Sequence, residues 1–339
     1  MDFEKYLSDN AGSINDVIAS FYIEQKSADI ARYLYTPLAK YSANGGKRHR
    51  PLICILACRA VGGTTALALH AAAAIEHFHT AALIHDDIAD ESTMRHGAPC
   101  LHLTEGMGLA INAGDLALSQ VTGTVLQDEA LADDVKLRVL NELVNMTTRT
   151  IEGQALDIGW ARDGRFDLTV DDYLLMATHK TAYYSGGVPL AVGAIIGGGN
   201  EREIETLRSF GMAAGLAFQI QDDLLNLVGD ETKLGKDFRS DITEGKRTLP
   251  VVYTIQECGR SDIDSSKRLV QILSSHTSSV RELDEAVCIM REAGAIEYAH
   301  DYASKLVNDA TEALIKELQP SNARDLLVSM GDFFIRRNA

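Results

Sequence analysis

The stretch Ala81-Ala82-Leu83-Ile84-His85-Asp86-Asp87-Ile88-Ala89-Asp90 organises the sequence, because an apolar run of helix-favouring residues ends there in three carboxylates. Residues four apart lie on one face of a helix, so Asp86 and Asp90 point the same way and Asp87 lies beside them. Three like charges in one turn repel each other, and a bound cation would remove that repulsion. The stretch therefore predicts a helix end that binds metal, although a solvated acidic helix end has the same pattern.

A second acidic cluster, Asp222-Asp223-Leu224-Leu225-Asn226, follows another apolar segment far downstream. Its carboxylates end a segment that we expect to be buried, and buried carboxylates need partners. Ligand sets made only of oxygen suit a hard cation such as magnesium, which keeps its waters and shares them with substrate phosphates. Two such clusters on facing helices of one bundle predict a site for several magnesium ions across a cavity.

Length and composition favour one helical domain. The 339 residues allow one large domain or two ordinary ones. Hydrophobic residues make up 46% of the chain and aromatic residues only 6%, and alanine and leucine runs are more frequent than β-branched alternation. No linker and no internal repeat interrupts the helical pattern. We therefore expect an all-α fold, a large helical bundle around a central cavity, in a single domain over residues 1–339.

The net charge of −16 argues against binding to nucleic acid, which needs a basic surface. The five cysteines are scattered and lack zinc spacing, so we expect free thiols in a reducing compartment; they are Cys54, Cys58, Cys100, Cys258 and Cys288. The N-terminus is acidic rather than signal-like, and no stretch is apolar for long enough to span a bilayer. These features predict a cytoplasmic protein with no transmembrane segment.

Hydrophobic periodicity predicts the helices. Residues 3–42 are expected to form two amphipathic helices with a break near Ser27. After the permissive Gly45-Gly46 turn, Pro51 can open the next helix at its first position. Asp115 fits a cap or first-turn acid of a helix that starts near Asn112, and the Ser- and Asp-rich residues 259–281 predict a surface excursion. Further helices are expected over 51–62, 65–90, 134–160, 170–185, 188–198, 201–229, 240–258, 264–275, 280–292, 295–318 and 321–337.

Several cations lie beside the acidic motifs or in loops punctuated by glycine. They are Lys47, Arg50, Arg95, Lys180, Lys236 and Lys246. Each of them alone is more often a solvated surface cation. Together with carboxylate-bound magnesium they supply what a polyphosphate needs, which is metal on one side and charge-assisted hydrogen bonds on the other. No Walker-type phosphate loop is present, so the sequence does not indicate a nucleotide.

These residues together resemble the trans-prenyltransferases, the polyprenyl synthetases that make geranyl, farnesyl, geranylgeranyl and longer diphosphates. The resemblance covers nearly the whole chain. It rests on motifs that occur in the family's order: Gly45-Gly46-Lys47-Arg48-His49-Arg50-Pro51, the stretch from His79 to Asp90, Gly153-Gln154-Ala155-Leu156-Asp157, Lys180-Thr181, Phe218-Gln219 with Asp222-Asp223, and Gly235-Lys236 with Lys246.

The resemblance implies a role for each matching residue and, in addition, a homodimer. The implied ligands of three magnesium ions are Asp86, Asp90 and Asp222, with support from Asp87, Asp157 and Asp223. The implied binders of the allylic diphosphate are Arg95, Lys180, Thr181, Gln219, Lys236 and Lys246. The implied binders of isopentenyl diphosphate are Lys47, Arg50, His79 and His96. The residues expected to be catalytic are Asp86, Asp90, Asp222 and Lys180.

Two residues depart from the family pattern. The family has a second arginine after the first acidic motif, and this chain has His96, which donates one hydrogen bond and is only partly charged near neutral pH. We therefore expect weaker and more pH-dependent binding of isopentenyl diphosphate. Asn226 stands where many members have Asp. Because an amide oxygen can still ligate a metal directly or through water, we expect little loss there.

The implied reaction is a head-to-tail condensation. Magnesium and the cations stabilise the departing diphosphate, so that the allylic C–O bond ionises. The isopentenyl double bond attacks the allylic cation. The released diphosphate then takes the proton, since no side-chain base is evident in the motifs. Apolar helix faces must keep water out of the site, because water would quench the cation.

Product length depends on the helix that carries Asp86, along which the growing tail should run. The residues four and five positions earlier, about 6–7 Å below, are Ala82 and Ala81, which leave the first turn open. Phe78, in the next turn, is large enough to end the tail, although it also fits an ordinary core position. The expected product is geranylgeranyl diphosphate (C20), with farnesyl diphosphate or a longer product as alternatives.

Two other classes of protein share part of the pattern. A class I terpene cyclase also uses an acidic motif and three magnesium ions, but it needs no site for isopentenyl diphosphate, so Lys47, Arg50 and His79 count against it. A non-catalytic subunit of a heteromeric prenyltransferase usually lacks one acidic motif, and this chain has both. An assay with labelled isopentenyl diphosphate and each allylic diphosphate distinguishes these classes.

Overall fold

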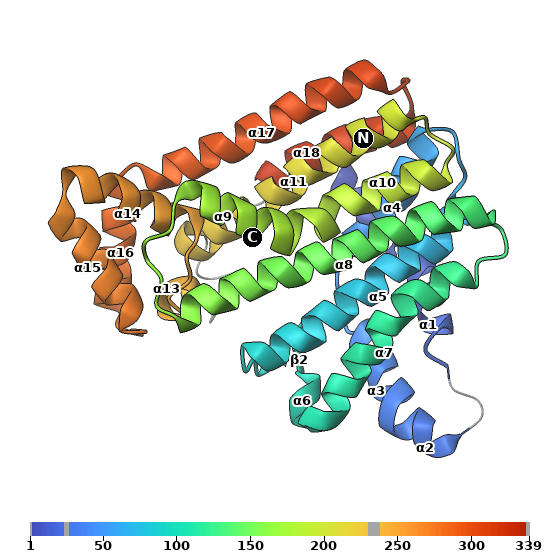
Figure 1. Ribbon diagram of the computed structural model, residues 1–339, viewed down its shortest axis with the longest axis horizontal. Helices are drawn as coiled ribbons and strands as arrows, with labels where there is room; N and C mark the ends of the chain where they lie inside the picture. Colours follow the sequence, from blue (N-terminus) through green and yellow to red (C-terminus); the bar gives the residue numbers. More distant parts are fainter. Residues whose placement is uncertain (1, 24–26, 230–237, 337–339) are drawn as a thin grey trace. The chain divides into compact units, whose positions relative to one another are not determined.

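The computed structural model describes residues 2–23, 27–229 and 238–336, and its ribbon is almost entirely helical (Figure 1). The predicted all-α class is confirmed. Within these residues the only sheet is an antiparallel hairpin of β1 (Met94–Arg95) and β2 (Ala98–Pro99). The chain forms two compact units: the first unit is Met1–Thr147, Val188–Arg208 and Glu317–Ser329, and the second unit is Thr148–Gly187, Ser209–Lys316 and Met330–Ala339.

The helices of the first unit include a short π-helical segment, η1, near the N-terminus. They are α1 (Phe3–Ser20), α2 (Ala28–Ile30), η1 (Ala31–Tyr35), α3 (Thr36–Ala43), α4 (His49–Ala60), α5 (Thr65–Ala89), α6 (Leu101–Thr104), α7 (Met107–Leu126) and α10 (Val188–Ile196). The break expected near Ser27 is confirmed, because Ser27 caps α2 through a hydrogen bond from the Ile30 amide to its hydroxyl oxygen at 3.3 Å.

The helices of the second unit include a longer π-helical segment, η2, directly after α9. They are α9 (Val170–Ala177), η2 (Thr178–Gly187), α13 (Ser240–Thr243), α14 (Leu249–Ser261), α15 (Ile263–Ser274) and α16 (Val280–Glu292). Four helices have residues in both units: α8 (Asp133–Arg162), α11 (Glu201–Val228), α17 (Ala295–Glu317) and α18 (Asn322–Arg336).

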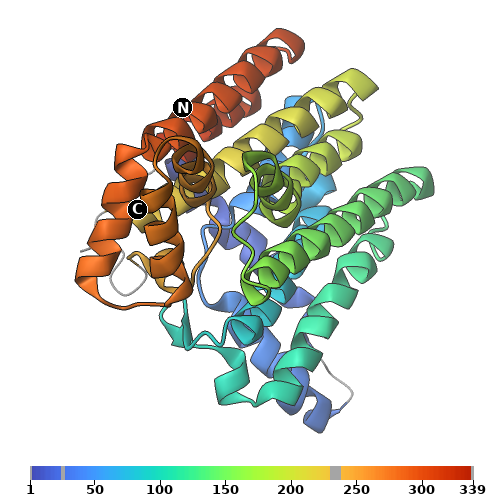
Figure 2. The ribbon, with the colours of Figure 1, turned by 60° about the vertical axis from the view of Figure 1, so that its left-hand side comes forward.

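Helix α5 forms the centre of the first unit, where it packs against α4 and α7 (Figures 1 and 2). Its residues Ala71–Ala74 are fully buried, and their small side chains allow neighbouring helices to approach on several sides. The expectation that no stretch is apolar for long enough to span a bilayer is corrected, because among the described residues α5 has the necessary length and composition, with 67% of its most apolar window buried inside the protein. The helix expected over 65–90 is confirmed.

The loop before α4 differs from the expectation in one detail. Gly45 and Gly46 have φ angles of +94° and +95°, which other residues rarely adopt, so the permissive turn expected there is confirmed. The helix begins at His49, however, so Pro51 is its third residue and not its first. Proline is compatible with that position because the amides of the first turn have no acceptor within the helix.

Two further boundaries differ from the expectation because glycine ends or precedes a helix there. Helix α7 begins at Met107, after Gly106 with a φ of +87°, so Asp115 lies inside the helix and is not a cap. The helix expected over 240–258 is broken, because Gly245 adopts a φ of +66° after α13. The chain becomes helical again only at Leu249.

The segment 259–281 is not the surface excursion that its composition predicted. Helix α15 occupies most of it, and the side chains of Leu269, Ile272 and Leu273 are fully buried. These residues recur at helical spacing, so one face of α15 joins a core cluster of the second unit.

A buried ion pair ties the start of α4 to α5. The Arg48 guanidinium Nη1 lies 2.5 Å from Glu76 Oε1, and the two side chains are only 7% and 3% exposed. Arg48 also donates from Nε to the Asn15 side-chain oxygen at 2.7 Å, and it donates to the Ser42 carbonyl. One side chain thus connects α1, α3, α4 and α5.

Replacing Glu76 with alanine is expected to lower the free energy of unfolding by about 3–5 kcal/mol, because the Arg48 guanidinium would stay buried without its carboxylate. Urea unfolding followed by circular dichroism measures the change. The matched control is Arg138→Ala, which breaks the exposed pair with Glu201 and should cost less than about 1 kcal/mol. Equal losses for the two variants would contradict the role of Arg48 as a structural anchor.

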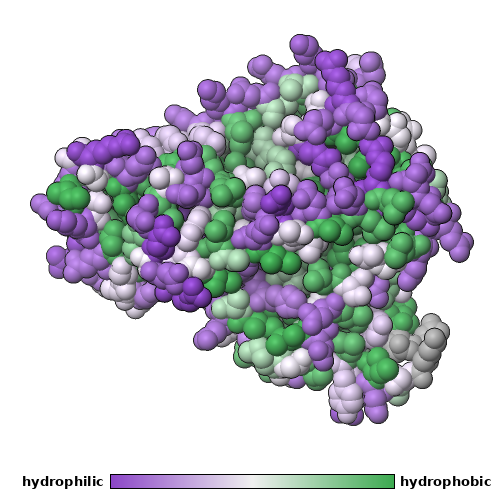
Figure 3. Space-filling model, viewed as in Figure 1, coloured by the Kyte–Doolittle hydropathy of each residue, from purple (hydrophilic) through white to green (hydrophobic). Residues whose placement is uncertain are grey.

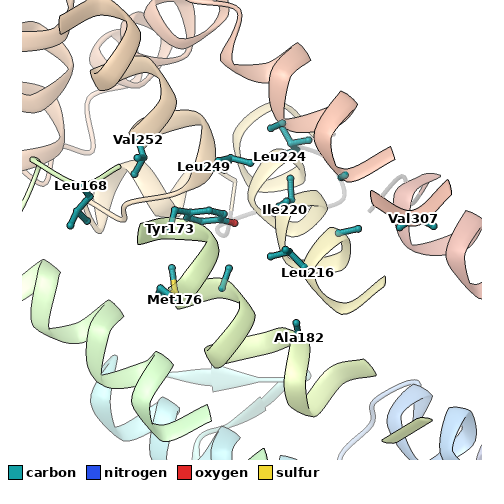
Figure 4. Packing of buried hydrophobic residues seen from close by; sticks show 14 residues of the cluster. Leu168, Tyr173, Met176, Ala182, Leu216, Ile220, Leu224, Leu249, Val252 and Val307 are labelled. Carbon is teal, nitrogen blue, oxygen red and sulfur yellow. The ribbon is translucent and has the colours of Figure 1, made fainter. Parts of the chain in front are cut away.

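The second unit has its own apolar core, in which α9, α11, α14 and α17 take part (Figure 4). Figure 4 shows the Tyr173 ring of α9 beside Leu249 of α14 and Ile220 of α11, with the hydroxyl oxygen towards α11. Tyr173 is 1% exposed, so its apolar ring fills the core and its hydroxyl must find a partner there. This packing positions α9 and η2 along α11.

Candidate active site

The last turn of α5 presents the first acidic motif in the first unit. Asp86 is half-buried and Asp90 is exposed, one helical turn later. Asp87 is 1% exposed and accepts hydrogen bonds from the Tyr41 hydroxyl at 2.7 Å and from Arg95 Nε at 2.8 Å. One carboxylate of the motif, that of Asp87, is therefore buried and hydrogen-bonded within the protein, and the other two are more accessible to solvent.

The β1–β2 hairpin positions Arg95. His96 and Gly97 form the two-residue turn, and their φ angles of +50° and +78° are those that tight hairpins require. The hairpin brings Arg95 Nη2 to 2.6 Å from the Asp87 carboxylate and 3.8 Å from that of Asp86. The cation is thus held beside the acidic motif.

Two of the residues expected to bind isopentenyl diphosphate are in contact in the first unit. Arg50 Nη1 and His79 Nε2 lie 3.2 Å apart. Burial lowers the pKa of His79 well below its usual value of 6.5, and the positive charge of Arg50 adds to that effect. His79 is therefore neutral at pH 7 and offers a hydrogen bond rather than a charge.

His96 and Lys47 lie at the rim of the same region. A Cβ placed on Gly45 would be 3.4 Å from the Cβ of His96, so the hairpin turn lies against the loop that carries Lys47. Lys47 is exposed. Burial, together with the positive charge of Arg95, lowers the pKa of His96 below 6.5. This direction agrees with the expectation that His96 is only partly charged near neutral pH.

The residues expected to limit product length lie on α5 and precede the acidic motif in the sequence. Phe78 and Ala81 are 3% and 2% exposed, and Ala82 is half-buried. Phe78 and His85 are seven residues apart and share one helix face. That face is turned towards α7, because a Cβ on Gly114 would lie 2.4 Å from the His85 ring.

The second unit contains a pocket of about 280 Å³. Residues that the sequence singled out line much of it: Asp157, Lys180, Gln219, Asp222, Asp223, Asn226 and Lys246. Residues that it did not single out complete the wall: Tyr173, Met176, Ser240, Asp241, Arg247 and Thr248. Charged groups of both signs therefore converge on one concave surface. Lys236, which was also predicted to bind the allylic diphosphate, lies outside the described residues.

Hydrogen bonds connect the second acidic motif to η2. Asp223 accepts from the Tyr173 hydroxyl at 2.7 Å and from the Gln219 amide at 2.8 Å. Gln219 in turn accepts from the Thr181 hydroxyl at 2.7 Å. Burial, with a contribution from nearby Asp241, raises the pKa of Asp223 to about 7. This network leaves Asp223 oriented by its neighbours, with Asp222 beside it on the wall of the pocket.

The two lysines of the pocket are both paired with carboxylates. The Lys180 ammonium group forms an ion pair with Asp157. The Lys246 ammonium group lies 3.2 Å from Asp241 and 2.8 Å from Glu244. Although burial alone would lower the pKa of Lys246, these two carboxylates raise it well above its usual value. Both lysines are therefore fixed cations at the pocket.

Sequence reasoning missed Asp241. It stands five residues before Lys246, on the other side of the Gly245 turn, and a carboxylate at that distance from a predicted phosphate-binding lysine was the available signal. Burial raises its pKa, and the charge of Lys246 opposes that rise. Asp241 thus adds a further carboxylate to the pocket wall.

Asn226 has a structural use that its place in the motif did not suggest. Its side chain donates to the Ser240 hydroxyl at 3.0 Å and accepts from the Asp241 amide at 3.2 Å. The amide group thereby attaches the start of α13 to the end of α11. The earlier idea of Asn226 as a metal ligand stays a prediction.

The donors suit a hard divalent cation, but they do not enclose one. Among the described residues, no group of three or more histidine, cysteine, aspartate or glutamate side chains is arranged to hold a metal ion. The available carboxylates come as neighbours, Asp86 with Asp90 in the first unit and Asp222 with Asp223 in the second. Such sparse, all-oxygen sets fit an ion that keeps waters and takes further ligands from a substrate phosphate.

Comparisons with known proteins extend over most of the chain. The family model for polyprenyl synthetase matches residues 31–290. A short chain isoprenyl diphosphate synthase of Methanothermobacter thermautotrophicus is 40% identical over 293 residues, which cover 86% of this chain and 87% of the relative.

Solved structures have the same fold. The geranylgeranyl pyrophosphate synthetase of Pyrococcus horikoshii superimposes with a TM-score of 0.89 at 34% identity, covering 99% of this chain and 98% of that chain. A geranylgeranyl pyrophosphate synthase of Corynebacterium glutamicum, complexed with isoprenyl diphosphate and magnesium, gives a TM-score of 0.87 at 28% identity, covering 99% and 100%.

Proposed function

This chain belongs to the polyprenyl synthetase family and is a prenyltransferase, and we propose that it condenses isopentenyl diphosphate head-to-tail with an allylic diphosphate to give geranylgeranyl diphosphate. One observation of the structure carries the proposal. The pocket of the second unit sets the cations Lys180 and Lys246 beside the carboxylates Asp157, Asp222 and Asp241. A wall of this kind can bind a diphosphate and a divalent cation together.

The proposed metal is magnesium, with three ions per site. The residues that would hold it are Asp86, Asp90 and Asp222, with Asp87, Asp157 and Asp223 in support. When bound, magnesium draws negative charge from the diphosphate and makes it a better leaving group. The proposal is supported by the all-oxygen donors and by the magnesium in the Corynebacterium glutamicum structure.

The proposed allylic diphosphate site uses Arg95, beside the first acidic motif, together with cations and polar groups from later in the chain. These later residues are Lys180, Thr181, Gln219, Lys236 and Lys246. Lys180 and Lys246 stay charged during the reaction, because each is paired with a carboxylate. A substrate diphosphate would share these ammonium groups, and the interaction strengthens as negative charge develops on the leaving oxygen.

The proposed isopentenyl diphosphate site lies in the first unit and consists of Lys47, Arg50, His79 and His96. Arg50 and Lys47 supply charge, and neutral His79 supplies directed hydrogen bonding. The site is less positive than one with a second arginine at position 96. A weaker grip on isopentenyl diphosphate is the expected consequence.

The proposed reaction starts with heterolytic cleavage of the allylic C–O bond, and the electron pair goes to the diphosphate oxygen. Lys180 and Lys246 stabilise the charge that develops there. The isopentenyl double bond then forms the new C–C bond to the allylic cation. Loss of a proton to the released diphosphate restores a double bond. The apolar side chain of Met176 in the wall of the pocket would help to keep water away from the cation.

A product assay tests the proposal. The purified protein is incubated with magnesium, labelled isopentenyl diphosphate and, separately, dimethylallyl, geranyl and farnesyl diphosphate, and the products are measured by mass spectrometry. The expected result is a C20 diphosphate from at least one primer. Release of a cyclic hydrocarbon without use of isopentenyl diphosphate would instead support a terpene cyclase, and no product from any pair would contradict the proposal.

Replacing His96 with arginine is expected to lower the KM for isopentenyl diphosphate about tenfold at pH 7.5, since a charge-assisted hydrogen bond replaces a neutral one. The difference in KM between the arginine variant and wild type should shrink as the pH falls below the pKa of His96, which lies under 6.5, because the wild-type side chain then gains its proton. Steady-state kinetics between pH 5.5 and 8 measure both effects.

The control for this prediction is His96→Gln, which keeps a hydrogen-bond donor and cannot gain a charge. Its KM, relative to that of the arginine variant, should not change with pH. A pH profile for wild type that matches the glutamine variant would exclude His96 from the site.

Three wider features are part of the proposal. The chain acts as a single catalytic domain, which is supported by a family match that extends through residues of both units. It acts in the cytoplasm, which is supported by the buried free thiols.

The chain is also proposed to form a homodimer. This is supported by large apolar side chains that are exposed among polar ones on α7 and the first half of α8 (Figure 3): Met107, Ile111, Leu126, Leu137 and Val144. Light scattering that gave the mass of a single chain would contradict the dimer.

A further inference from the structure

The helix that carries Lys180 and Thr181 is unusually wide. Residues Thr178–Gly187 form η2, a π-helical segment of ten residues that continues from α9. Most π-helical segments are single turns inside an α-helix, and they are frequent at functional sites. A π-helical segment of this length is rare, so we expect surrounding structure to hold it in place.

Helix α8 touches the backbone of η2 at Lys180 itself. A Cβ placed on Gly153 would lie 2.1 Å from the Lys180 amide nitrogen and 2.6 Å from its Cα, and Cβ atoms essentially never come closer than 3.0 Å. One turn later on α8, Asp157 pairs with the Lys180 ammonium group. The same helix therefore supports the backbone of Lys180 and orients the end of its side chain.

Helix α11 supports η2 in the same manner. A Cβ on Gly211 would lie 2.4 Å from the Gly186 carbonyl oxygen. A Cβ on Gly215 would lie 2.9 Å from Ala182 Cα. Figure 4 shows Ala182 of η2 near Leu216 of α11, where the two helices pack. Four residues after Gly215, on the same face, Gln219 accepts the hydrogen bond from Thr181.

We propose that Gly153, Gly211 and Gly215 are positioning residues for the prenyl-transfer reaction. By presenting bare backbone, they let α8 and α11 hold η2 at contact distance, and so they fix Lys180 and Thr181 at the wall of the pocket. The inference rests on the proposed function, since the group that is positioned is the allylic diphosphate site.

The helix positions of these glycines support the proposal. Glycine inside a helix is less favourable than alanine by roughly 0.5–1 kcal/mol, so its presence needs a compensating reason. Gly159, on the same helix as Gly153, has no atom of a neighbouring element within 4 Å of its added Cβ. Gly159→Ala is therefore a matched control, with the same substitution in the same helix but without the contact.

Gly153→Ala is expected to lower kcat/KM for the allylic diphosphate at least tenfold, because a shift of about 1 Å in a catalytic group is costly. The KM for isopentenyl diphosphate should change less than twofold, since its proposed binders lie in the first unit. Gly159→Ala should keep wild-type kinetics and an equal or higher melting temperature. Wild-type kinetics in Gly153→Ala would overturn the inference.

A double mutant separates positioning from general damage. If Gly153 acts through Lys180, then adding Gly153→Ala to Lys180→Ala should lower kcat/KM by less than a further twofold. A full, multiplicative tenfold loss in the double mutant would overturn the inference, because the glycine would then act on the fold at large.

Gly215→Ala covers the case in which Gly153→Ala does not fold. Its Cβ lies 2.9 Å from Ala182 Cα, so η2 needs to move only slightly, and a three- to tenfold fall in kcat/KM is expected. Unchanged kinetics in this variant would also count against the inference.

Calorimetry with inorganic pyrophosphate and magnesium gives a readout that does not depend on turnover. Gly153→Ala, or Gly215→Ala in its place, should bind pyrophosphate at least tenfold more weakly than Gly159→Ala. Failure of the proposed function would appear as an inactive wild type that still shows this difference. Failure of the present inference would appear as an active wild type whose glycine variants bind and react as it does.

Discussion

Replacing Asp222 with asparagine is expected to lower kcat about a thousandfold, equivalent to about 4 kcal/mol of transition-state stabilisation. Asp222 lines the pocket beside Asp223 and is the proposed magnesium ligand of the second acidic motif. Without its charge, the site would hold the cation less tightly, and the departing diphosphate would lose stabilisation when its negative charge develops.

The same substitution should not destabilise the fold. Asp222 contributes to raising the pKa of Asp223, which shows that the two carboxylates repel each other. Removing one of the two charges relieves that repulsion, so the melting temperature should stay equal or rise. This combination of lost activity and kept stability is typical of a functional group rather than a structural one.

Steady-state kinetics with saturating substrates measure kcat, and a magnesium titration should show a higher concentration at half-maximal rate. The control is Asp301→Asn on α17, where an aspartate side chain is 87% exposed and distant from the proposed roles. If Asp222→Asn kept kcat within tenfold of wild type, the ligand role would have to be withdrawn.

Replacing Phe78 with alanine is expected to lengthen the main product beyond C20 by one or more five-carbon units. Phe78 is 3% exposed and lies eight residues before Asp86, about 12 Å along the helix at 1.5 Å per residue. Ala81 and Ala82 leave the turn next to Phe78 with small side chains, so we expect the Phe78 ring to be the side chain that stops the tail. Its removal would open space for a longer tail.

The substitution should also cost about 3–5 kcal/mol of stability, because it leaves a cavity at a buried aromatic position. A matched control therefore has to lose stability without touching the tail. Phe3→Ala fits, since Phe3 is 1% exposed in the first unit and lies on α1. Its product should stay at C20. A folded Phe78→Ala variant with an unchanged product in mass spectrometry would exclude Phe78 as the stop.

Periodicity predicted the long helices well, because each buries a continuous apolar face. The expected ranges 65–90, 201–229 and 280–292 agree closely with α5, α11 and α16. Two of the errors concern boundaries at which glycine adopts a positive φ, at Gly106 and Gly245. Periodicity does not report where a left-handed residue will end a helix, since that depends on the contacts of the loop.

The sequence predicted which residues belong to the candidate site better than it predicted which side chains those residues contact. Spacing four apart on one helix related Asp86 to Asp90, and adjacency in the sequence related Asp222 to Asp223, because both relations are local. The partners that orient the predicted residues come from distant parts of the chain: Tyr41 for Asp87, and Tyr173 for Asp223.

The sequence by itself determined the helical class, the family and the two acidic motifs, because these depend on local spacing and on residue type. Only the tertiary structure decided which carboxylate of the first motif is buried, how Asn226 attaches α13 to α11, and why Gly153 has no side chain. Each of those answers depends on atoms that are remote in sequence and close in space. The physical reason is that hydrogen bonding and steric exclusion act over a few ångströms, whatever the separation along the chain.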